Sequence, residues 1–350
     1  MIAVVALAGC NQSSMAAVVS PTPRPSPSVA TAPKPAVDFS CRLPVVTNSQ
    51  GEVSTNYQGG FIQFPQGTLT FDRNGFMVGR ADDVVTVASP VLAGNGEVPF
   101  YDRALNRWIP ARANQSLPDG SQYAYVTYDR NTGAFTAHVT TVASGASRAF
   151  PLNTLSSPVV TDFTAAGVYL AGLGGIGGPG EHVWLLDPRN GSIKELGSVH
   201  RVWTARNGYA WVARLDPRDT TKWPAMEIAP ADSLVRIDLA TGAETVWYYQ
   251  AGRYPWLVGL DSSNRPVVVL GSEAGVNEFR LVDKPGSEGQ VVFRGNMSGL
   301  GYFQGDHGRL WFGRYDGIYL YTPAEGFRKV FDYGGNVDAN SGIQPAGFCQ

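Results

Sequence analysis

The sequence predicts an all-β fold, and three observations lead to that prediction. Short runs of β-branched and aromatic residues alternate with tight turns across residues 60–333. The composition suits strands joined by turns, because the chain has 41 glycines and 24 prolines but only 16% charged residues. No segment shows the apolar period of a long amphipathic helix.

The segment from Leu310 to Tyr321 shows the pattern most clearly. It reads as two short strands around an Asp-Gly turn, in which Gly317 supplies the positive φ that such a turn needs. Similar hairpins recur at a spacing of about 40 to 50 residues, the period of a four-stranded propeller blade. They span residues 98–110, 135–152, 182–196, 234–249, 278–293 and 318–331.

Five of these hairpins follow another apolar strand, at residues 123–128, 168–171, 209–212, 266–270 and 309–312. The sequence therefore predicts a β-propeller of six four-stranded blades, with seven blades as the alternative. A sandwich or a parallel β-helix would also show many short strands, but Asp-x-x-x-Gly turns at blade spacing favour the propeller.

The two ends of the domain show a weaker pattern. Residues 41–46 are expected to form one strand, and residues 50–60 a polar loop. Residues 334–349 and 41–59 are expected to supply the closure of the propeller or a degenerate seventh blade.

Two segments resemble the repeats of known propeller families. Residues 117–126, with a Pro-Asp-Gly turn leading into an apolar strand, resemble the repeat of TolB-type propellers. Residues 310–321 resemble the repeat of propellers in two-component regulator sensors. Each resemblance covers one blade, so it implies the fold and no catalytic residue.

The N-terminus predicts export and lipid anchoring. An apolar run over residues 2–8 ends in Leu7-Ala8-Gly9-Cys10, which resembles a bacterial lipobox, although no Lys or Arg precedes the run. The resemblance implies a signal peptide over residues 1–10 and diacylglycerol on Cys10. Residues 11–38, rich in Pro, Ser and Ala, are expected to be an extended tether to a domain at 39–350. This order predicts an extracytoplasmic protein of the bacterial cell envelope.

Two cysteines remain, at the two ends of the predicted domain. An exported protein meets an oxidising compartment, and a ring-shaped fold brings its ends together, so Cys41 and Cys349 are expected to form a disulfide. Closing such a loop stabilises the fold by roughly 5 kcal/mol in the chain-entropy model.

The candidate binding face is formed by three connections between the second and third strands of successive blades. They are the segments 172–181, 215–232 and 271–276, and long loops of this kind usually carry recognition. The first is rich in glycine but lacks the ending and the following helix of a phosphate loop. The candidate contact residues on these connections are Glu181, Arg218, Lys222, Trp223, Glu227 and Glu273.

Trp223 is the one aromatic residue here that is a candidate exposed anchor for a partner or a sugar ring, with simple packing within its loop as the alternative. The other aromatic residues of this region are expected to pack between blades; they are Trp203, Trp211, Tyr248, Tyr249, Tyr254 and Trp256. The chain's four histidines, His138, His182, His200 and His307, show no metal-ligand spacing, and no cofactor is predicted. The sequence leaves open a Ca²⁺ or Zn²⁺ site in the central channel, because ligands that come from separate blades leave no local motif.

The leading functional hypothesis is a lipid-anchored binding module of the envelope. Its expected partner is an envelope protein or a cell-wall glycan, and the net charge of −2 gives no argument for nucleic acid. The alternative is a secreted propeller enzyme of the hydrolase, lyase or lactonase type, with its site in the central channel. No nucleophile elbow or other catalytic motif is present in the sequence to name catalytic residues.

Overall fold

The computed structural model describes part of the chain in detail. The described residues are 37–50, 55–78, 84–86, 100–103, 105–109, 111–129, 131–152, 155–172, 182–196, 199, 201–216, 231–270, 277–295, 303–306, 308–334 and 342–350. Among them the regular structure is β-strand, apart from one 3-10 helix, Ala113–Gln115. None of the helical residues described is part of a segment long and apolar enough to cross a membrane.

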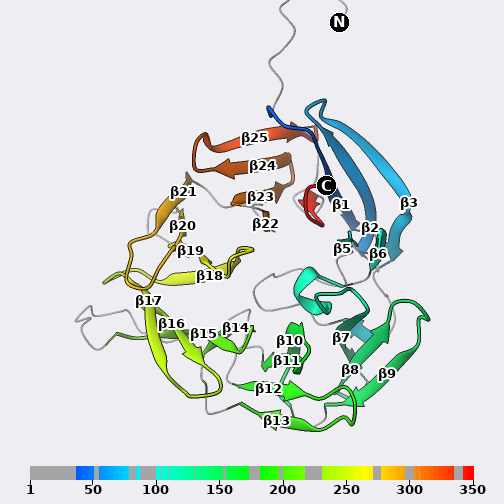
Figure 1. Cartoon of the computed structure of the whole chain (residues 1–350), viewed down its shortest axis with the longest axis vertical. Coiled ribbons are helices and arrows are strands. Elements are labelled where there is room, and N and C mark those ends of the chain that lie inside the picture. The colour runs from blue at the N-terminus through cyan, green and yellow to red at the C-terminus, as the bar shows by residue number, and fades with distance from the viewer. Residues whose placement is uncertain are drawn as a thin grey trace, which may run out of the picture. The chain divides into compact units, whose positions relative to one another are not determined.

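Four sheets contain four antiparallel strands each, in the orders β4-β7-β8-β9, β10-β11-β12-β13, β14-β15-β16-β17 and β18-β19-β20-β21 (Figure 1). The strands are β4 (Val84–Thr86), β7 (Gln122–Asp129), β8 (Ala134–Thr141), β9 (Ser147–Pro151), β10 (Pro158–Thr164), β11 (Gly167–Gly172), β12 (Val183–Leu186), β13 (Ile193–Glu195), β14 (Val202–Arg206), β15 (Tyr209–Arg214), β16 (Ser233–Asp238), β17 (Glu244–Tyr249), β18 (Pro255–Leu260), β19 (Pro266–Leu270), β20 (Asn277–Leu281) and β21 (Gln290–Gly295).

A larger sheet of eight strands joins the two ends of the domain. Its strands are β22 (Phe303–Asp306), β23 (Arg309–Arg314), β24 (Gly317–Thr322), β25 (Gly326–Asp332), β26 (Gly342–Pro345), β1 (Cys41–Gln50), β2 (Thr55–Phe64) and β3 (Thr68–Val78). β26 pairs with β1, so that Val45 lies opposite Pro345. The predicted disulfide between Cys41 and Cys349 is present, with the two Cα atoms 5.5 Å apart.

The second strands of three sheets, β11, β15 and β19, are buried on both of their faces. In β15, Ala210 and Val212 pack toward the sheet of β10–β13, whereas Trp211 and Ala213 pack toward the sheet of β18–β21. Successive side chains of a strand point to opposite faces, so a strand covered on both faces needs a continuous apolar run instead of an alternating one. The same reason explains the fully buried side chains of β11 and β19.

Core clusters link each sheet to the next one along the chain. One cluster joins β7–β9 to β10–β12, and further clusters join the following sheets in sequence order up to β22–β25. The last cluster packs Trp311 of β23 and Ile318 of β24 against Leu43 of β1 and Ile62 of β2. Four-stranded antiparallel sheets that pack face to face in succession are the architecture of a β-propeller, which confirms the predicted fold class.

Five of the six predicted hairpins form the outer pairs of four-stranded groups: β8–β9, β12–β13, β16–β17, β20–β21 and β24–β25. Two other expectations are wrong. Most of the polar loop expected at residues 50–60 belongs to strands, because β1 runs to Gln50 and β2 begins at Thr55. The polar residues of β1 and β2 give little strand signal in the sequence. The pairing of β1 with β2 and β26 stabilises these strands nonetheless.

The hairpin expected at 98–110 is also not the outer pair of a four-stranded sheet. It forms a separate two-stranded sheet of β5 (Phe100–Asp102) and β6 (Arg107–Ile109). Trp108 docks it onto the N-terminal strands, where a Cβ atom on Gly59 would lie 2.7 Å from the indole. The indole Nε1 donates a hydrogen bond to Asp72 Oδ2 at 3.0 Å. Gly59 and Gly75 have no side chains, and the space this leaves accommodates the Trp108 indole that holds the hairpin in place.

Candidate functional site

Hydrogen bonds between turns define two opposite edges of the sheets. Asn207, in the turn from β14 to β15, donates its backbone N–H to Asp162 Oδ2 at 2.8 Å and its Nδ2 to Asn264 Oδ1 at 3.2 Å. Asp162 lies in β10, and Asn264 lies in the turn from β18 to β19. The first turns of three successive sheets thus meet at one edge, which we call the turn edge. Because neighbouring strands are antiparallel, the connections from second to third strand leave from the other edge, which we call the loop edge.

The turn edge is held together from sheet to sheet. Beyond Asn264, Gly305 of β22 lies so near the next turn that an added Cβ would be 2.8 Å from the backbone N of Ser262. Asp306, at the end of β22, accepts a hydrogen bond from the backbone N–H of Cys349 at 3.2 Å. Cys349 is then bonded to Cys41 at the start of β1. Side-chain, backbone and covalent links therefore secure the inner strands at this edge.

Burial of Asp162 has an electrostatic consequence at the turn edge. Desolvation raises the pKa of this carboxyl, opposed by the hydrogen bond from Asn207 and by the charge of Arg206. Asn207 and Asn264 both adopt positive φ, at 51° and 59°, which asparagine tolerates better than other residues with a side chain. Asn207 and Asn264 therefore serve both as positive-φ turn residues and as hydrogen-bond partners between sheets.

The three predicted binding connections leave from the loop edge. They join β11 to β12, β15 to β16 and β19 to β20, as the sequence predicts. The candidate contact residues on them lie outside the described residues, as does the predicted lipidation site. These residues are Glu181, Arg218, Lys222, Trp223, Glu227, Glu273 and Cys10.

The base of the second connection is tightly bonded. Asp232 is fully buried, and its Oδ1 accepts a hydrogen bond from the backbone N–H of Asp216 at 2.6 Å. The backbone N–H of Asp232 donates to the carbonyl of Arg214 at 3.1 Å, and Ser233 Oγ donates to the same carbonyl at 3.0 Å. The two ends of the connection are therefore held together where they leave the sheet.

An exposed tryptophan lies at the loop edge, on the first strand of its sheet. Trp256 of β18 is 42% exposed, although the residues on either side of it are buried. Its ring stacks on that of Trp203 of β14, with centroids 5.3 Å apart and an interplanar angle of 28°. Trp203 is completely buried. The exposed part of the indole would contribute about 2 kcal/mol to stability if it were buried. A binding partner that covers it could gain this free energy, so Trp256 is a candidate contact residue.

Tyr254 completes this aromatic group. Its ring meets Trp203 edge-on at 6.3 Å and Trp256 edge-on at 6.4 Å. Burial raises the pKa of Tyr254, opposed by the charge of Arg201 and a hydrogen bond with it, so the phenol stays protonated at neutral pH. Arg201 has a positive φ of 61°, an unusual conformation for a residue with a long side chain. We call Trp203, Trp256, Tyr254 and Arg201 the tryptophan platform.

A polar group lies at the loop edge near the platform, in the sheet that also contains Trp256. Glu278 of β20 forms ion pairs with Arg280 and with Arg294 Nε, the latter at 2.5 Å. Partial burial would raise the pKa of Glu278, but the hydrogen bonds from Arg294 and Arg280 lower it on balance. Burial also raises the pKa of Tyr248 to about 12, and its hydroxyl donates to Gln250 Oε1 at 2.6 Å. These groups stay in one protonation state near neutral pH, which suits support rather than proton transfer.

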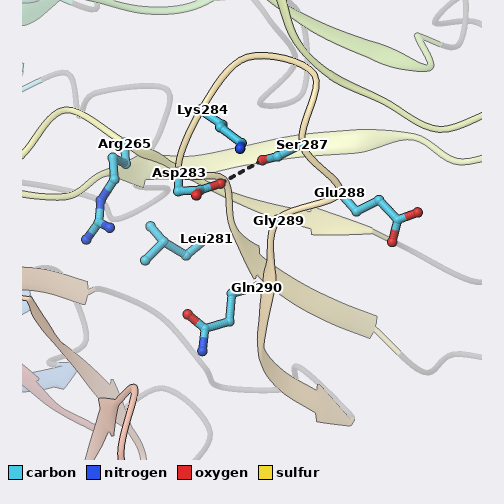
Figure 2. A pocket seen from close by; sticks show the side chains of 8 residues that line it. All are labelled: Arg265, Leu281, Asp283, Lys284, Ser287, Glu288, Gly289 and Gln290. Carbon is cyan, nitrogen blue, oxygen red and sulfur yellow. Dashed lines mark hydrogen bonds between the residues drawn. The ribbon is translucent and has the colours of Figure 1, made fainter.

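A pocket of about 440 Å³ lies at the turn edge, within the hairpin of β20 and β21 (Figure 2). Asp283 accepts a hydrogen bond from Ser287 Oγ at 2.8 Å, which lowers the pKa of its carboxyl. Arg265 is already paired with buried Asp261 at 2.7 Å. The lining residues thus pair one hydroxyl, that of Ser287, with a carboxylate of lowered pKa, which is a weak general base. They are Arg265, Leu281, Asp283, Lys284, Ser287, Glu288, Gly289 and Gln290.

Two of the four histidines belong to the described part of the chain, and each contacts strand residues. His138 Nε2 lies 2.9 Å from Thr127 Oγ1, and the ring stacks on Tyr125. His182 Nδ1 lies 2.9 Å from Glu195 Oε1, and its ring stacks on Trp184. Across the described ranges, no group of three or more His, Cys, Asp or Glu residues is arranged to hold a metal ion.

Of the six aromatic residues expected to pack between sheets, Trp203, Trp211 and Tyr248 are buried, and Tyr249 and Tyr254 are partly buried. Trp256 is the residue that this expectation missed. Sequence alone treats it like its neighbours, because strands buried on two faces show no alternation to mark an exposed position. Its exposure is decided by the side chains around it, because Trp203, also on the first strand of a sheet, is completely buried.

Comparisons with known proteins find distant similarity to solved structures. No model of a known protein family matches the sequence, and no curated protein matches it. Among solved structures, the β-propeller domain of the Trilobed protease from Pyrococcus furiosus is 13% identical, with a TM-score of 0.40 over 83% of this chain and 81% of that one. TolB from Acinetobacter baumannii is 9% identical, with a TM-score of 0.43 over 88% of this chain and 65% of that one. A chain of a nidogen/laminin complex is 8% identical, with a TM-score of 0.45 over 87% and 98%.

Proposed function

We propose that this protein is a lipid-anchored binding module of the bacterial cell envelope. Its ligand face is the loop edge, with the connections 172–181, 215–232 and 271–276. We further propose six blades, whose inner strands are β4, β10, β14, β18, β22 and β26. The ligand is an envelope protein or a cell-wall glycan.

The observation that carries the proposal is that Trp256 is exposed at the loop edge while Trp203, on which it stacks, is completely buried. Trp256 is exposed there on a backing of buried aromatic residues, at the edge from which all three connections leave. Exposed aromatic residues on a rigid scaffold, next to loops, are typical of recognition surfaces. Leu215, at the base of the second connection, adds a second exposed apolar side chain at this edge.

Two features support the envelope location. The lipobox-like sequence at Cys10 precedes a proline-rich tether, and the domain carries a disulfide. Structural disulfides persist in oxidising compartments outside the cytoplasm. Replacing Cys10 by serine should move the protein from the membrane fraction to the soluble fraction. A Cys10→Ser protein that stays in the membrane fraction would contradict lipid anchoring.

Affinity capture tests the ligand face. The bait is the full chain with Cys10→Ser, exposed to solubilised envelope proteins and, separately, to purified cell-wall glycan. A loop-edge variant combines Arg218→Ala, Lys222→Ala and Trp223→Ala. The matched control combines Arg189→Ala and Lys284→Ala, which removes two cations from the β12–β13 and β20–β21 turns at the turn edge.

We expect the bait and the control to retain the same partner, and the loop-edge variant to lose it. Equal retention by all three proteins would show that binding does not use these connections, and would contradict the proposal. Release of soluble fragments from the glycan by the unmodified domain would instead favour the alternative, a propeller enzyme.

A further inference from the structure

We propose that the tryptophan platform binds a pyranose ring of a polysaccharide, with the sugar stacked on Trp256. This inference rests on the proposed binding function of the loop edge and names the ligand class for one part of it. The ring of Trp256 is partly exposed, one of its faces lies against Trp203, and Tyr254 flanks it edge-on.

The platform is rigid before any ligand arrives. Trp256 lies opposite Val269 in the pairing of β18 with β19. Trp203 lies between Val202 and Thr204, where the register of β14 against β15 shifts. A ring whose orientation is set by its backing loses little entropy when a ligand stacks on it. This property favours a small contact surface that binds well.

The size of the exposed patch favours a small ring over a protein surface. In β18 only Trp256 is exposed, while Pro255 and Leu257 are buried and the three following residues are partly buried. The core of a protein interface usually needs a wider apolar surface than a single indole. One indole face matches the area of a single ring.

The open side of the platform favours a sugar over a flat aromatic ring. A pyranose has a C–H-rich face that packs on an indole, while its hydroxyl groups remain hydrated on the other side. A flat aromatic ligand would keep one apolar face in water on such an open platform. A cationic ligand is disfavoured, because the guanidinium of Arg201 is bonded to Tyr254 beside the ring and repels a second positive charge.

Titration of the complete chain with Cys10→Ser tests the inference. The probes are chitohexaose, cellohexaose and maltohexaose, and the counter-probes are AMP as a flat aromatic ring and choline as a cation. Binding is followed by tryptophan fluorescence and by calorimetry. The variant is Trp256→Ala, and Phe71→Ala on β3 is the control, because Phe71 is an exposed aromatic residue away from the platform.

We expect at least one hexasaccharide to bind, with a dissociation constant near 1 mM or below, to be weakened about tenfold by Trp256→Ala and to be unchanged by Phe71→Ala. Trp256→Phe should keep part of the affinity because it keeps an aromatic face. Thermal unfolding verifies that each variant is folded.

Three results would overturn the inference: no hexasaccharide binding, binding that Trp256→Ala leaves unchanged, or Trp256-dependent binding of AMP or choline in place of sugars. Failure here is distinguishable from failure of the proposed function. A partner that is captured through Arg218, Lys222 and Trp223 would still support a binding module even if the platform binds no sugar.

Discussion

The two edges of the sheets differ in how they are held. At the turn edge, Asn207 bonds to Asp162 and Asn264 in the neighbouring sheets, and the disulfide links the ends of the domain. At the loop edge, the described bonds at the second connection, such as that from Asp216 to Asp232, hold one sheet's own strands together. Contacts between sheets at the loop edge include the tryptophan platform, where Trp203 stacks on Trp256 and Arg201 bonds to Tyr254. The turn edge is therefore held by turn hydrogen bonds and a disulfide, whereas the loop edge joins two sheets through aromatic side chains, one of which is exposed.

The inner strands repeat this contrast on a smaller scale. The side chains of β10 and β14 are buried almost throughout, whereas β18 exposes Trp256. All three strands have a register shift against their second strand. Equivalent strands in one architecture can therefore serve either the core or the surface, and the neighbouring side chains decide which.

The largest expected effect concerns the covalent link at the turn edge. Replacing both Cys41 and Cys349 by serine should lower the free energy of unfolding by roughly 5 kcal/mol, because the disulfide closes most of the domain into a loop. Urea unfolding measures the change. A reducing agent should shift the unfolding of the natural protein similarly and leave the double variant unchanged. If urea unfolds both proteins at the same concentration, the disulfide does not stabilise this edge.

The next effect tests the close approach of β22 to the neighbouring turn. Gly305→Ala should cost about 2 kcal/mol of stability, because the new Cβ would meet the backbone at Ser262 and Asp261. Gly242→Ala is the matched control, since its site is open and only its φ of 74° opposes a side chain. It should cost about 1 kcal/mol. Equal losses at the two sites, measured by urea unfolding, would show that the sheets separate easily at this edge.

A third prediction separates backbone strain from side-chain bonding at Asn207. Asn207→Gly keeps the positive φ but loses the bond to Asn264, so it should cost about 1 kcal/mol. Asn207→Ala loses the bond and strains the turn, so it should cost about 2 kcal/mol. Thermal unfolding ranks the two variants. A glycine variant as stable as the natural protein would mean that the bond between the sheets adds nothing.

The fourth prediction concerns the loop edge, where a large side chain should matter little for stability. Trp256→Ala should lower the free energy of unfolding by about 1 kcal/mol, because much of its ring is already in water. Trp203→Ala, which empties a fully buried site, should cost about 4 kcal/mol. A loss at Trp256 as large as that at Trp203 would mean that the platform belongs to the core.

The smallest expected effect is a pH dependence at the turn edge. Burial raises the pKa of Asp162 in the folded protein above its ordinary value of 3.8. The folded state therefore binds the proton more tightly, and this contribution to stability is lost as the pH rises through the raised pKa. Asp162→Asn removes the titration, so its stability relative to the natural protein should increase with pH across that window. A difference that stays constant from pH 3 to pH 8 would contradict the raised pKa.

Much of the fold follows from local sequence signals. A tight turn between β23 and β24 forms at the predicted place, but its two turn residues are Tyr315 and Asp316, and Gly317, at a φ of 150°, begins β24. Five hairpins and the strands before them lie at the predicted places, because their turn residues and apolar runs act over a few residues. Pairing of Cys41 with Cys349 was also predictable, since these two cysteines lie at the two ends of the domain.

Long-range pairing accounts for what the sequence could not show. The polar residues of β1 and β2 have little strand signal of their own, and β26 stabilises β1 from the opposite end of the chain. The hairpin of β5 and β6 leaves the blade pattern because Trp108 fits beside Gly59 and Gly75. Neither fact is visible to a pattern that covers only neighbouring residues.

The sequence by itself determined the class of fold, five hairpins with the strands that precede them, and the edge from which the long connections leave. Only the tertiary structure decided which aromatic residue stays exposed and which sheets are bonded through Asp162, Asn207 and Asn264. The physical reason is that turn chemistry and apolar runs are local properties of the chain. Exposure and sheet-to-sheet hydrogen bonds depend on which distant segments come to lie beside each residue.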